Sequence, residues 1–595
     1  MSALFDIRRH GAAFALVSAL VRIRIGCLAQ SKFAGGAARA QLTSSAPSEA
    51  PHPQHTGPEG HVRGKRGGAH FGVIWRSWLS DWRRRAALLL AAAAVAACAS
   101  LPPFEPAPAS HALDDVAGTR LATVAAASLP ADDATVSGFR LLPEGETAFA
   151  ARIALIRRAE RSLDLQYYLI QDDAVGRRFL RELRDAAARG VRVRVLVDDL
   201  YTAGEDDLFA GLAAFANVEV RLFNALPSRS GSLGTRLLGS LWDLGRVNHR
   251  MHNKLLVADN SLAVSGGRNI AAEYFMRSKS ANFIDLDVLS SGAVVSAFSS
   301  LFDDFWNSEE VRPVAQVTGV RPDEAARHRF DDRVADAPEI VERDRDVLGA
   351  IPLGTQLDAG RLAQALAHAR VFADSPGKVR GEGGTTVTGQ TLAIFATASE
   401  DVGIVSPYFI PGEAGMEIIR SVGSTQENGR ITLVTNSLAA TDEPLVYERY
   451  ARYRLALLKA GVRIYEVGAA LSRDSERLGN FGSSRSRLHA KVATIDHQRI
   501  FVGSMNLDPR SANDNTEIGL VIDSPVLAET AESLFRERVE SGTYRLRLSA
   551  GGERIEWVET DAEGHERVHT SEPDDDPWLR FKLWLLAPWV PEGVL

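Results

Sequence analysis

His252-Asn253-Lys254, followed by Asp259, Gly266 and Asn269, returns later in the chain as His489-Ala490-Lys491, followed by Asp496, Gly503 and Asn506. In both copies the lysine comes two residues after the histidine, the aspartate seven, the glycine fourteen and the asparagine seventeen. One match of this kind has odds of roughly a few per cent in a chain of this size. Two copies with the same downstream residues indicate a duplicated functional unit.

The sequence around each copy alternates between helical and strand patterns. In the first half, helices are predicted at 148–161 and 176–188, and strands at 162–170 and 191–197. The second half repeats this order, with strands at 402–410 and 430–435 and a helix at 415–422. The sequence therefore predicts an α/β fold with two structurally similar halves.

Composition limits the class of protein. The chain has 595 residues, of which 45% are hydrophobic and 24% charged, so neither wholesale disorder nor a polytopic membrane protein is expected. The formal net charge of −7 disfavours general nucleic-acid binding. The only cysteines are Cys27 and Cys98, which excludes a disulfide framework and a structural zinc site built from cysteines.

Composition and motifs also divide the chain into six segments. Residues 1–72 are expected to be a disordered extension or a start-site artefact, 73–98 a lipoprotein-type signal segment, and 99–139 a tether and lead-in. The first α/β domain is expected at 140–310. A polar, Gly-rich connection follows at 311–389, with a helix expected at 359–373. The second domain occupies 390–595, including a C-terminal tail.

Within the signal segment a basic cluster at 83–85 is followed by an apolar run that ends at Cys98. Thirteen helical residues span about 20 Å, which is less than the roughly 30 Å hydrocarbon core of a bilayer. The run ends Val95-Ala96-Ala97-Cys98, which resembles the lipobox of bacterial lipoproteins and predicts lipidation of Cys98. A buried Ala-rich helix is the alternative. No methionine occurs between Met1 and Met251, so a start near Val73 or Leu79 would use another codon.

The motif residues suit an oxyanion. His and Lys two residues apart on a strand face the same side, and the Gly-x-x-Asn run is expected where a second strand ends, at 262–265 and 500–502. Glycines at that place let a ligand approach the backbone. An imidazole, an ammonium and an amide at one sheet edge form a set that recognises phosphate.

These motifs resemble those of the phospholipase D superfamily over about residues 140–595. Segments 250–254, 266–270, 285–288, 436–442 and 506–511 are similar to the class-C type of bacterial cardiolipin synthase. The resemblance implies two phospholipase D-like α/β/α halves, each a mixed sheet flanked by helices. It also implies that they pack as a pseudo-two-fold pair, with both motifs at a single site.

The resemblance further implies a two-step transfer through a phosphohistidine, with His252 as nucleophile and His489 as general acid and base. Lys254, Lys491, Asn269 and Asn506 would hold the phosphate oxygens. Asp259 and Asp496 complete the catalytic motifs and are expected to fix the motif loop rather than touch phosphate. Asp285 and Glu517, one strand after His252 and His489 respectively, are expected to orient the histidine of their own half. No metal or cofactor is implied.

Three classes of function remain open at this point. The first is a phosphatidyltransferase that makes cardiolipin from phosphatidylglycerol and a second phospholipid, with phosphatidylethanolamine as a candidate. The second is a hydrolase of the same fold, either a phospholipase D or, less favoured, a nuclease. The third is a non-catalytic lipoprotein. The expected partners are phospholipids and a membrane surface, with no nucleic acid, and the expected location is lipid-anchored and facing a bacterial periplasm.

Several residues near the motifs have more ordinary interpretations. His249 is expected in a loop, and Tyr167, Tyr168 and Tyr408 are expected to pack at strand ends. The Trp-rich segment 578–586 is expected to dock on the protein core, with a bilayer interface as the alternative.

Overall fold

The computed structural model of the protein describes residues 101–229, 231–338, 343–423, 431–468, 485–561, 563–573, 576–590 and 592–594. The signal segment and Cys98 lie outside the described residues. Residues 101–595 belong to one structural unit.

The first half is built on a mixed sheet. Its parallel strands are β2 (Ser162–Tyr167), β3 (Arg192–Asp198) and β4 (Val218–Phe223), with the short β9 (Val311–Pro313) antiparallel at the outer edge. On the other side of β2 the sheet continues antiparallel through β5 (Lys254–Ala258), β6 (Leu262–Gly266), β8 (Asp287–Gly292) and β1 (Ser137–Leu142). β5 therefore lies in the middle of the sheet, directly beside β2.

The second half repeats this arrangement. β11 (Val402–Val405), β12 (Ile431–Asn436) and β13 (Arg463–Val467) are parallel, and β15 (Val492–Ile495), β16 (Arg499–Gly503) and β17 (Ile518–Asp523) continue antiparallel from β11. A meander of β18 (Thr543–Leu548), β19 (Ile555–Thr560) and β20 (Glu566–His569) extends the sheet beyond β13. The two halves are therefore similar in strand order, as the repeated sequence pattern predicts.

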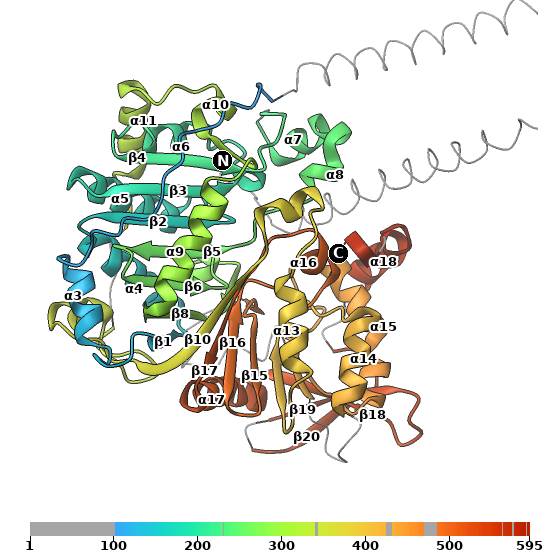
Figure 1. Cartoon of the computed structure of the whole chain (residues 1–595). Coiled ribbons are helices and arrows are strands. Elements are labelled where there is room, and N and C mark those ends of the chain that lie inside the picture. Colours follow the sequence, from blue (N-terminus) through green and yellow to red (C-terminus); the bar gives the residue numbers. More distant parts are fainter. Residues whose placement is uncertain are drawn as a thin grey trace, which may run out of the picture. The chain divides into compact units, whose positions relative to one another are not determined.

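Helices flank the sheets (Figure 1). The first half carries α4 (Gly145–Arg158), α5 (Ala174–Ala188), α6 (Asp206–Leu212) and α9 (Ala293–Trp306); the second carries α13 (Val387–Phe395), α14 (Gly412–Gly423), α15 (Pro444–Lys459) and α17 (Pro525–Gly542). Each half has its own apolar core. A third core joins side chains of both, among them Phe298 from α9, Leu520 from β17 and Leu527 from α17.

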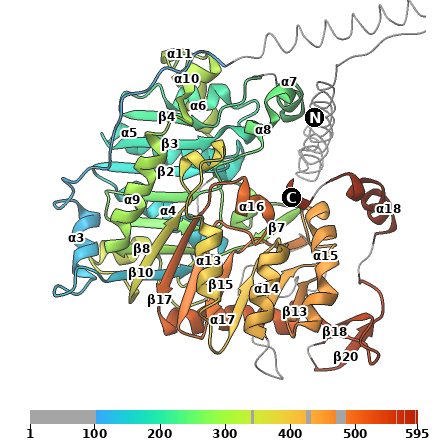
Figure 2. The same ribbon diagram turned by 45° about the vertical axis from the view of Figure 1, so that its right-hand side comes forward.

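The connection contains a correction to the sequence analysis, because the helix expected at 359–373 is wrong. A short helix, α12 (Leu353–Asp358), is followed by a strand, β10 (Ala365–Ala373), which lies between the two sheets in both views (Figures 1 and 2). β10 pairs antiparallel with β1 of the first half and with β17 of the second. The edges of both sheets offer backbone groups that need partners, and pairing with them outweighs the helix propensity of an Ala-rich segment.

The part of the connection before α12 packs on the first half. Its helices are α10 (Val314–Thr318) and α11 (Glu324–Val334), and Phe330 of α11 lies in the first core. The lead-in contains α3 (Arg120–Ala127), which the sequence analysis did not predict. Within the expected tether, the backbone oxygens of Pro102 and Pro108 accept hydrogen bonds from Arg312 and Arg221 of the first half.

The C-terminal segment forms α18 (Pro577–Leu586), an amphipathic helix. Leu583 is buried in the core of the second half, which agrees with the expected docking on the core. The opposite side is exposed: Trp578 and Trp584 keep 61% and 73% of their surface accessible. Their rings stack through Phe581, with ring centroids 5.6 and 6.1 Å apart. None of the described helices has the length and apolar character needed to span a bilayer.

Candidate active site

The two motif segments meet because each pairs with the backbone of the other half. β14 (Arg485–Leu488) lies parallel to β7 (Ala281–Ile284), with Leu488 opposite Ile284. Met251 forms a parallel bridge with Thr516. In this register the His489 amide donates to the Ile284 oxygen (2.8 Å), and the His252 amide donates to the Thr516 oxygen (2.9 Å). Asp285 follows Ile284 and Glu517 follows Thr516 in the chain. His489 is therefore placed beside Asp285, and His252 beside Glu517.

The side chains follow the same register. His252 Nδ1 lies 2.9 Å from Glu517 Oε2, and His489 Nδ1 lies 2.7 Å from Asp285 Oδ2. The expectation that each carboxylate orients the histidine of its own half is therefore wrong. Because the backbone of each motif pairs with the other half, each histidine contacts the carboxylate of the other half. A carboxylate on Nδ1 fixes the ring and leaves Nε2 for chemistry.

The motif lysines extend the site. Lys254 and Lys491 are buried, and each ammonium donates to the backbone oxygen of the histidine two residues earlier. β5 begins at Lys254 and β15 at Val492, so the histidines precede the strands instead of lying on them as expected. The chain still brings two histidines and two lysines together in one buried place.

Asn269 and Asn506 follow the ends of β6 and β16, as predicted. Both are buried, and Asn269 Nδ2 donates to the Tyr274 hydroxyl (3.0 Å). Among the residues that the structure describes, neither asparagine Oδ1 has a hydrogen-bond partner. Buried polar atoms without partners cost free energy, so a ligand that donates a hydrogen bond would satisfy each oxygen, while the amide nitrogens are the groups that can donate to a phosphate oxygen.

The motif aspartates lie away from the histidines. Asp259 and Asp496 follow β5 and β15 at the ends opposite to the lysines, with φ values of 49° and 53°. The Asp259 carboxylate accepts from the backbone amides of residues 160–162, where β2 begins. Asp496 does the same for residues 399–401, directly before β11. Both carboxylates hold the entry to the neighbouring central strand, and neither faces the histidines.

Burial and charge make the site asymmetric. Burial, and then the cations of Lys254 and Lys491, hold the pKa of His252 well below its usual value. Burial and Lys491 also lower the pKa of His489. Burial raises the pKa of Glu517 to about 7. Burial would raise the pKa of Asp285 as well, but His489 and Lys491 bring it down to about 2. His489 therefore faces a permanent carboxylate, whereas the carboxylate beside His252 titrates near neutral pH.

Aromatic side chains that sequence reasoning missed surround both histidines. The centroids of the Tyr168 and His252 rings lie 5.1 Å apart, and the Lys254 ammonium lies 5.4 Å from the centroid of the Tyr168 ring. Tyr274 and Phe283 lie 5.1 and 4.9 Å from His489. Tyr168 was expected only to pack. Its place directly after β2, the strand beside the motif strand, is the signal that could have assigned it to the site.

Acidic groups lie near the second motif and were also missed. Burial, and then Asp442, raises the pKa of Glu443 to about 8, and burial raises that of Asp508 to about 7. Burial and Asp442 also raise the pKa of Tyr408 well above its usual value. Asp442 and Asp508 lie within segments 436–442 and 506–511, whose sequence offered no reason to separate them from neighbouring polar residues.

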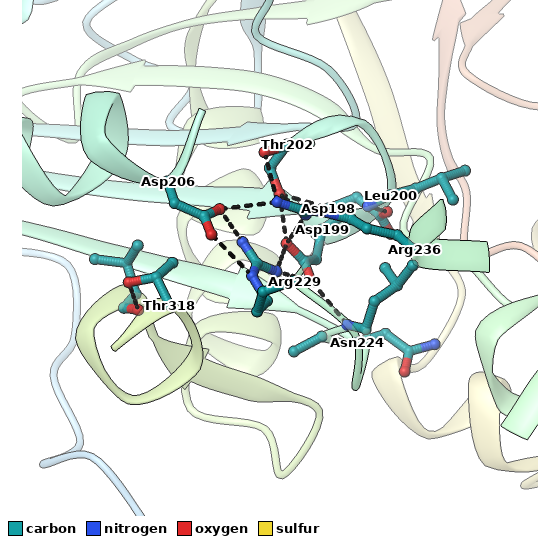
Figure 3. A network of polar contacts seen from close by, with 12 residues as sticks. Asp198, Asp199, Leu200, Thr202, Asp206, Asn224, Arg229, Arg236 and Thr318 are labelled. Atoms are coloured by element: carbon teal, nitrogen blue, oxygen red, sulfur yellow. Dashed lines mark hydrogen bonds and ion pairs between the residues drawn. The ribbon is translucent and has the colours of Figure 1, made fainter. Parts of the chain in front are cut away.

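A polar network lies at the end of β3 (Figure 3), and Asp198 of this network also holds the residues before His252. Asp198 accepts from the Met251 amide (2.8 Å) and from Arg250 Nη1 (3.1 Å). Asp199 accepts from the Leu226 amide and from Arg229 Nη1 (2.7 Å each). His249, expected in a loop, has Nδ1 3.0 Å from the Asp514 backbone oxygen of the other half. The residues before the first motif are therefore held from both sides.

The family model described as "Cardiolipin synthase, PLD-like domain" matches residues 153–306 and 392–539. Over 451 residues the chain is 37% identical to cardiolipin synthase C of Escherichia coli. This alignment covers 74% of this chain and 92% of the Escherichia coli protein. The chain belongs to the phospholipase D-like cardiolipin synthase family. It is 28% identical to cardiolipin synthase A of Pseudomonas fluorescens, over 66% of this chain and 67% of that protein. It is also similar to the crystal structure of a phosphatidylserine synthase from Haemophilus influenzae (TM-score 0.49, 13% identity, 79% and 96% of the two chains).

Proposed function

We propose that the protein is a phosphatidyltransferase that makes cardiolipin from phosphatidylglycerol and a second phospholipid through a covalent phosphohistidine. The observation that carries this proposal is the pairing of His252 with Glu517 and of His489 with Asp285, at 2.9 and 2.7 Å, beside two buried lysines. Two imidazoles, each with Nδ1 held by a carboxylate, in a cationic surrounding suit a displacement at phosphorus that occurs in two steps.

In the first step His252 Nε2 attacks the phosphorus of one phospholipid. The bond from phosphorus to the headgroup oxygen breaks, and His489 gives its proton to the leaving alcohol. Asp285 stabilises the imidazolium form of His489 that this step needs. The phosphatidyl group is then bound to His252.

In the second step a hydroxyl of phosphatidylglycerol replaces the departed headgroup. His489 takes the proton of that hydroxyl, its oxygen attacks phosphorus, and the bond to His252 breaks. Lys254, Lys491 and the amides of Asn269 and Asn506 stabilise the charge on the non-bridging oxygens in both steps. The protein needs no further group for this balance of protons and bonds.

A lipid readout tests the proposal. Purified protein is incubated with phosphatidylglycerol alone and with phosphatidylethanolamine added, and the products are separated. Cardiolipin in either incubation supports the transferase, and a yield that rises with phosphatidylethanolamine identifies it as the second phospholipid. Phosphatidic acid without cardiolipin would mean that water is the acceptor and that the protein is a phospholipase D-type hydrolase.

We propose in addition that the protein is lipid-anchored through Cys98, faces the periplasm, and contacts the membrane surface through α18. The support for this contact is the exposed stack of Trp578, Phe581 and Trp584, because tryptophan is favoured at the bilayer interface. Membrane contact would present phospholipid headgroups to the site.

A further inference from the structure

A cavity of about 240 Å³ lies in the second half among α13, α14 and α16 (Pro509–Asn513). These three helices lie side by side in both views (Figures 1 and 2). The lining of the cavity is predominantly apolar and includes Leu392, Phe395, Phe409, Ile418 and Ile419. Its polar side chains are few: Asp508 and Asn513 lie directly before α16 and on it, Thr388 lies in the first turn of α13, and Glu413 lies in the first turn of α14.

One end of the cavity is formed by the residues that follow Asn506 of the candidate active site. Leu507, Asp508 and Pro509 line it, and they directly follow Asn506. Leu507 also bridges to Phe409, and its backbone oxygen accepts from the Ile410 amide (2.7 Å). From this end the lining runs along α14 to Val422. The eleven residues from Gly412 to Val422 span about 15 Å of helix.

The first half shows that the fold itself does not require this cavity. There α4, α5 and the turn η3 (Ala272–Phe275) occupy the equivalent places, and the rings of Phe149 and Phe275 pack 4.8 Å apart among them. Phe275 comes twenty-three residues after His252, and Ala512 comes twenty-three residues after His489. The second half therefore has a methyl group lining the cavity where the first half has a phenyl ring in its core.

We propose that this cavity binds one acyl chain of a phospholipid substrate. The inference rests on the proposed function, because a phospholipid held at Asn506 by its phosphate has its acyl chains a glycerol unit away. An elongated apolar cavity matches an alkyl chain, which has no polar groups to satisfy. The polar end near Asp508 lies on the side of the phosphate, and the apolar length runs away from it.

The first test uses a photoreactive lipid. Phosphatidylglycerol with a diazirine at the end of one acyl chain is bound to full-length His252→Ala protein in detergent micelles, so that the lipid is not consumed. After irradiation, we expect labelled peptides from 387–395, 411–423 and 507–513. Adding Ala512→Phe should remove that label by filling the cavity. The matched control, Ala393→Phe, places the same ring on the exposed side of α13 and should leave the label unchanged.

The second test measures chain-length dependence in the otherwise unaltered protein. With monomeric phosphatidylglycerols, each added methylene that enters the cavity should raise kcat/KM about fourfold. Ala512→Phe should flatten this dependence and keep the activity on the shortest chains, whereas Ala393→Phe should keep the dependence.

Labels spread evenly over the protein surface, or a chain-length dependence that Ala512→Phe leaves intact, would overturn the proposal. The labelling does not depend on turnover. A cavity label together with phosphatidic acid as the sole product would therefore support the acyl-chain site while overturning the transferase.

Discussion

At the scale of single residues, the site is less symmetric than its motifs. The motifs alone do not decide which histidine attacks phosphorus. Burial and two lysines hold the pKa of His252 well below its usual value, which favours the neutral imidazole that a nucleophile requires. His489 faces Asp285, whose pKa of about 2 keeps it ionised and able to support an imidazolium. These environments favour His252 as nucleophile and His489 as acid and base.

Loss of the two histidines should therefore have different effects. His252→Ala should abolish turnover, because no covalent intermediate can form. His489→Asn should lower the rate by about 10²–10⁴-fold on a phospholipid, since general acid catalysis contributes about that much. A phosphodiester with a nitrophenol leaving group needs little protonation and should restore the first step only in His489→Asn.

The position of the trapped phosphorus checks the same assignment. After a denaturing quench of the restored His489→Asn protein, phosphorus from the substrate should be found on the peptide that contains His252. Phosphorus on the peptide around residue 489 in the reciprocal His252→Asn protein would reverse the roles. Inversion at phosphorus without any adduct would overturn the two-step mechanism.

The crossed carboxylates lead to a second prediction. Asp285→Asn should weaken His489 as an acid and lower kcat on phospholipid by about 10²-fold, and the nitrophenyl substrate should restore most of this loss. Glu517→Gln should instead weaken His252 as nucleophile, so a better leaving group should restore little. Measuring kcat for both variants on both substrates checks this. The opposite pattern would reverse the roles of the two histidines, because each carboxylate acts through the histidine that it contacts.

The pH dependence of kcat/KM is the third prediction. Glu517, with its pKa raised to about 7, is a carboxylate above that pH and loses its charge as the pH falls through it. Burial lowers the pKa of Lys491 to about 8, so its ammonium is present below that pH and is lost as the pH rises through it. We therefore expect kcat/KM to have a narrow maximum between about pH 7 and pH 8. Glu517→Gln should remove the acidic limb and keep the alkaline one; an unchanged acidic limb would assign it to another group.

At the scale of helices and strands, the sequence predicted most of what local patterns determine. Apolar periodicity located β3, β6, α5 and their counterparts, and identical motif spacing indicated the duplication. The sequence did not predict β10, because its Ala-rich pattern suits a helix and only the two sheet edges beside it make it a strand. Nor did it predict the partners of His252 and His489, since those contacts depend on strand pairing between segments more than two hundred residues apart.

The fourth prediction concerns α18. Replacing Trp578, Phe581 and Trp584 by serine should weaken binding to anionic phospholipid vesicles by about 10²-fold, because about 1 kcal/mol of apolar transfer is lost for each ring. The free energy of unfolding and the activity on detergent-dispersed lipid should change little, since the three side chains are exposed. Leu583→Ala, which removes a buried side chain of the same helix, should instead destabilise the protein and leave vesicle binding nearly intact. Equal vesicle binding by the triple variant would exclude this face as the membrane contact.

At the scale of the whole molecule, neither half contains a complete site. Each motif histidine depends on a carboxylate and a backbone oxygen from the other half, and β10 and a shared core hold the halves together. The duplication also allowed the halves to diverge where symmetry is not needed. The first half packs Phe149 and Phe275 into its core between α4 and η3, while the second half leaves a cavity beside Ala512. A symmetric pair of motifs can in this way serve a reaction whose two substrates differ.

The fifth prediction tests how the whole protein is held at a membrane. If Cys98 is lipidated after export, Cys98→Ala should shift the protein from the membrane fraction to the soluble fraction, or leave it mislocalised, while activity on detergent-dispersed lipid is retained. Cys27→Ala is the matched control and should behave as the unaltered protein. One lipid chain alone binds a bilayer only marginally, so a lipid anchor and α18 should act together. Combining Cys98→Ala with the triple serine variant should therefore release more protein than either change alone. Unchanged membrane association of Cys98→Ala, with no lipid on the peptide that contains Cys98, would show that α18 or another segment holds the protein without an anchor.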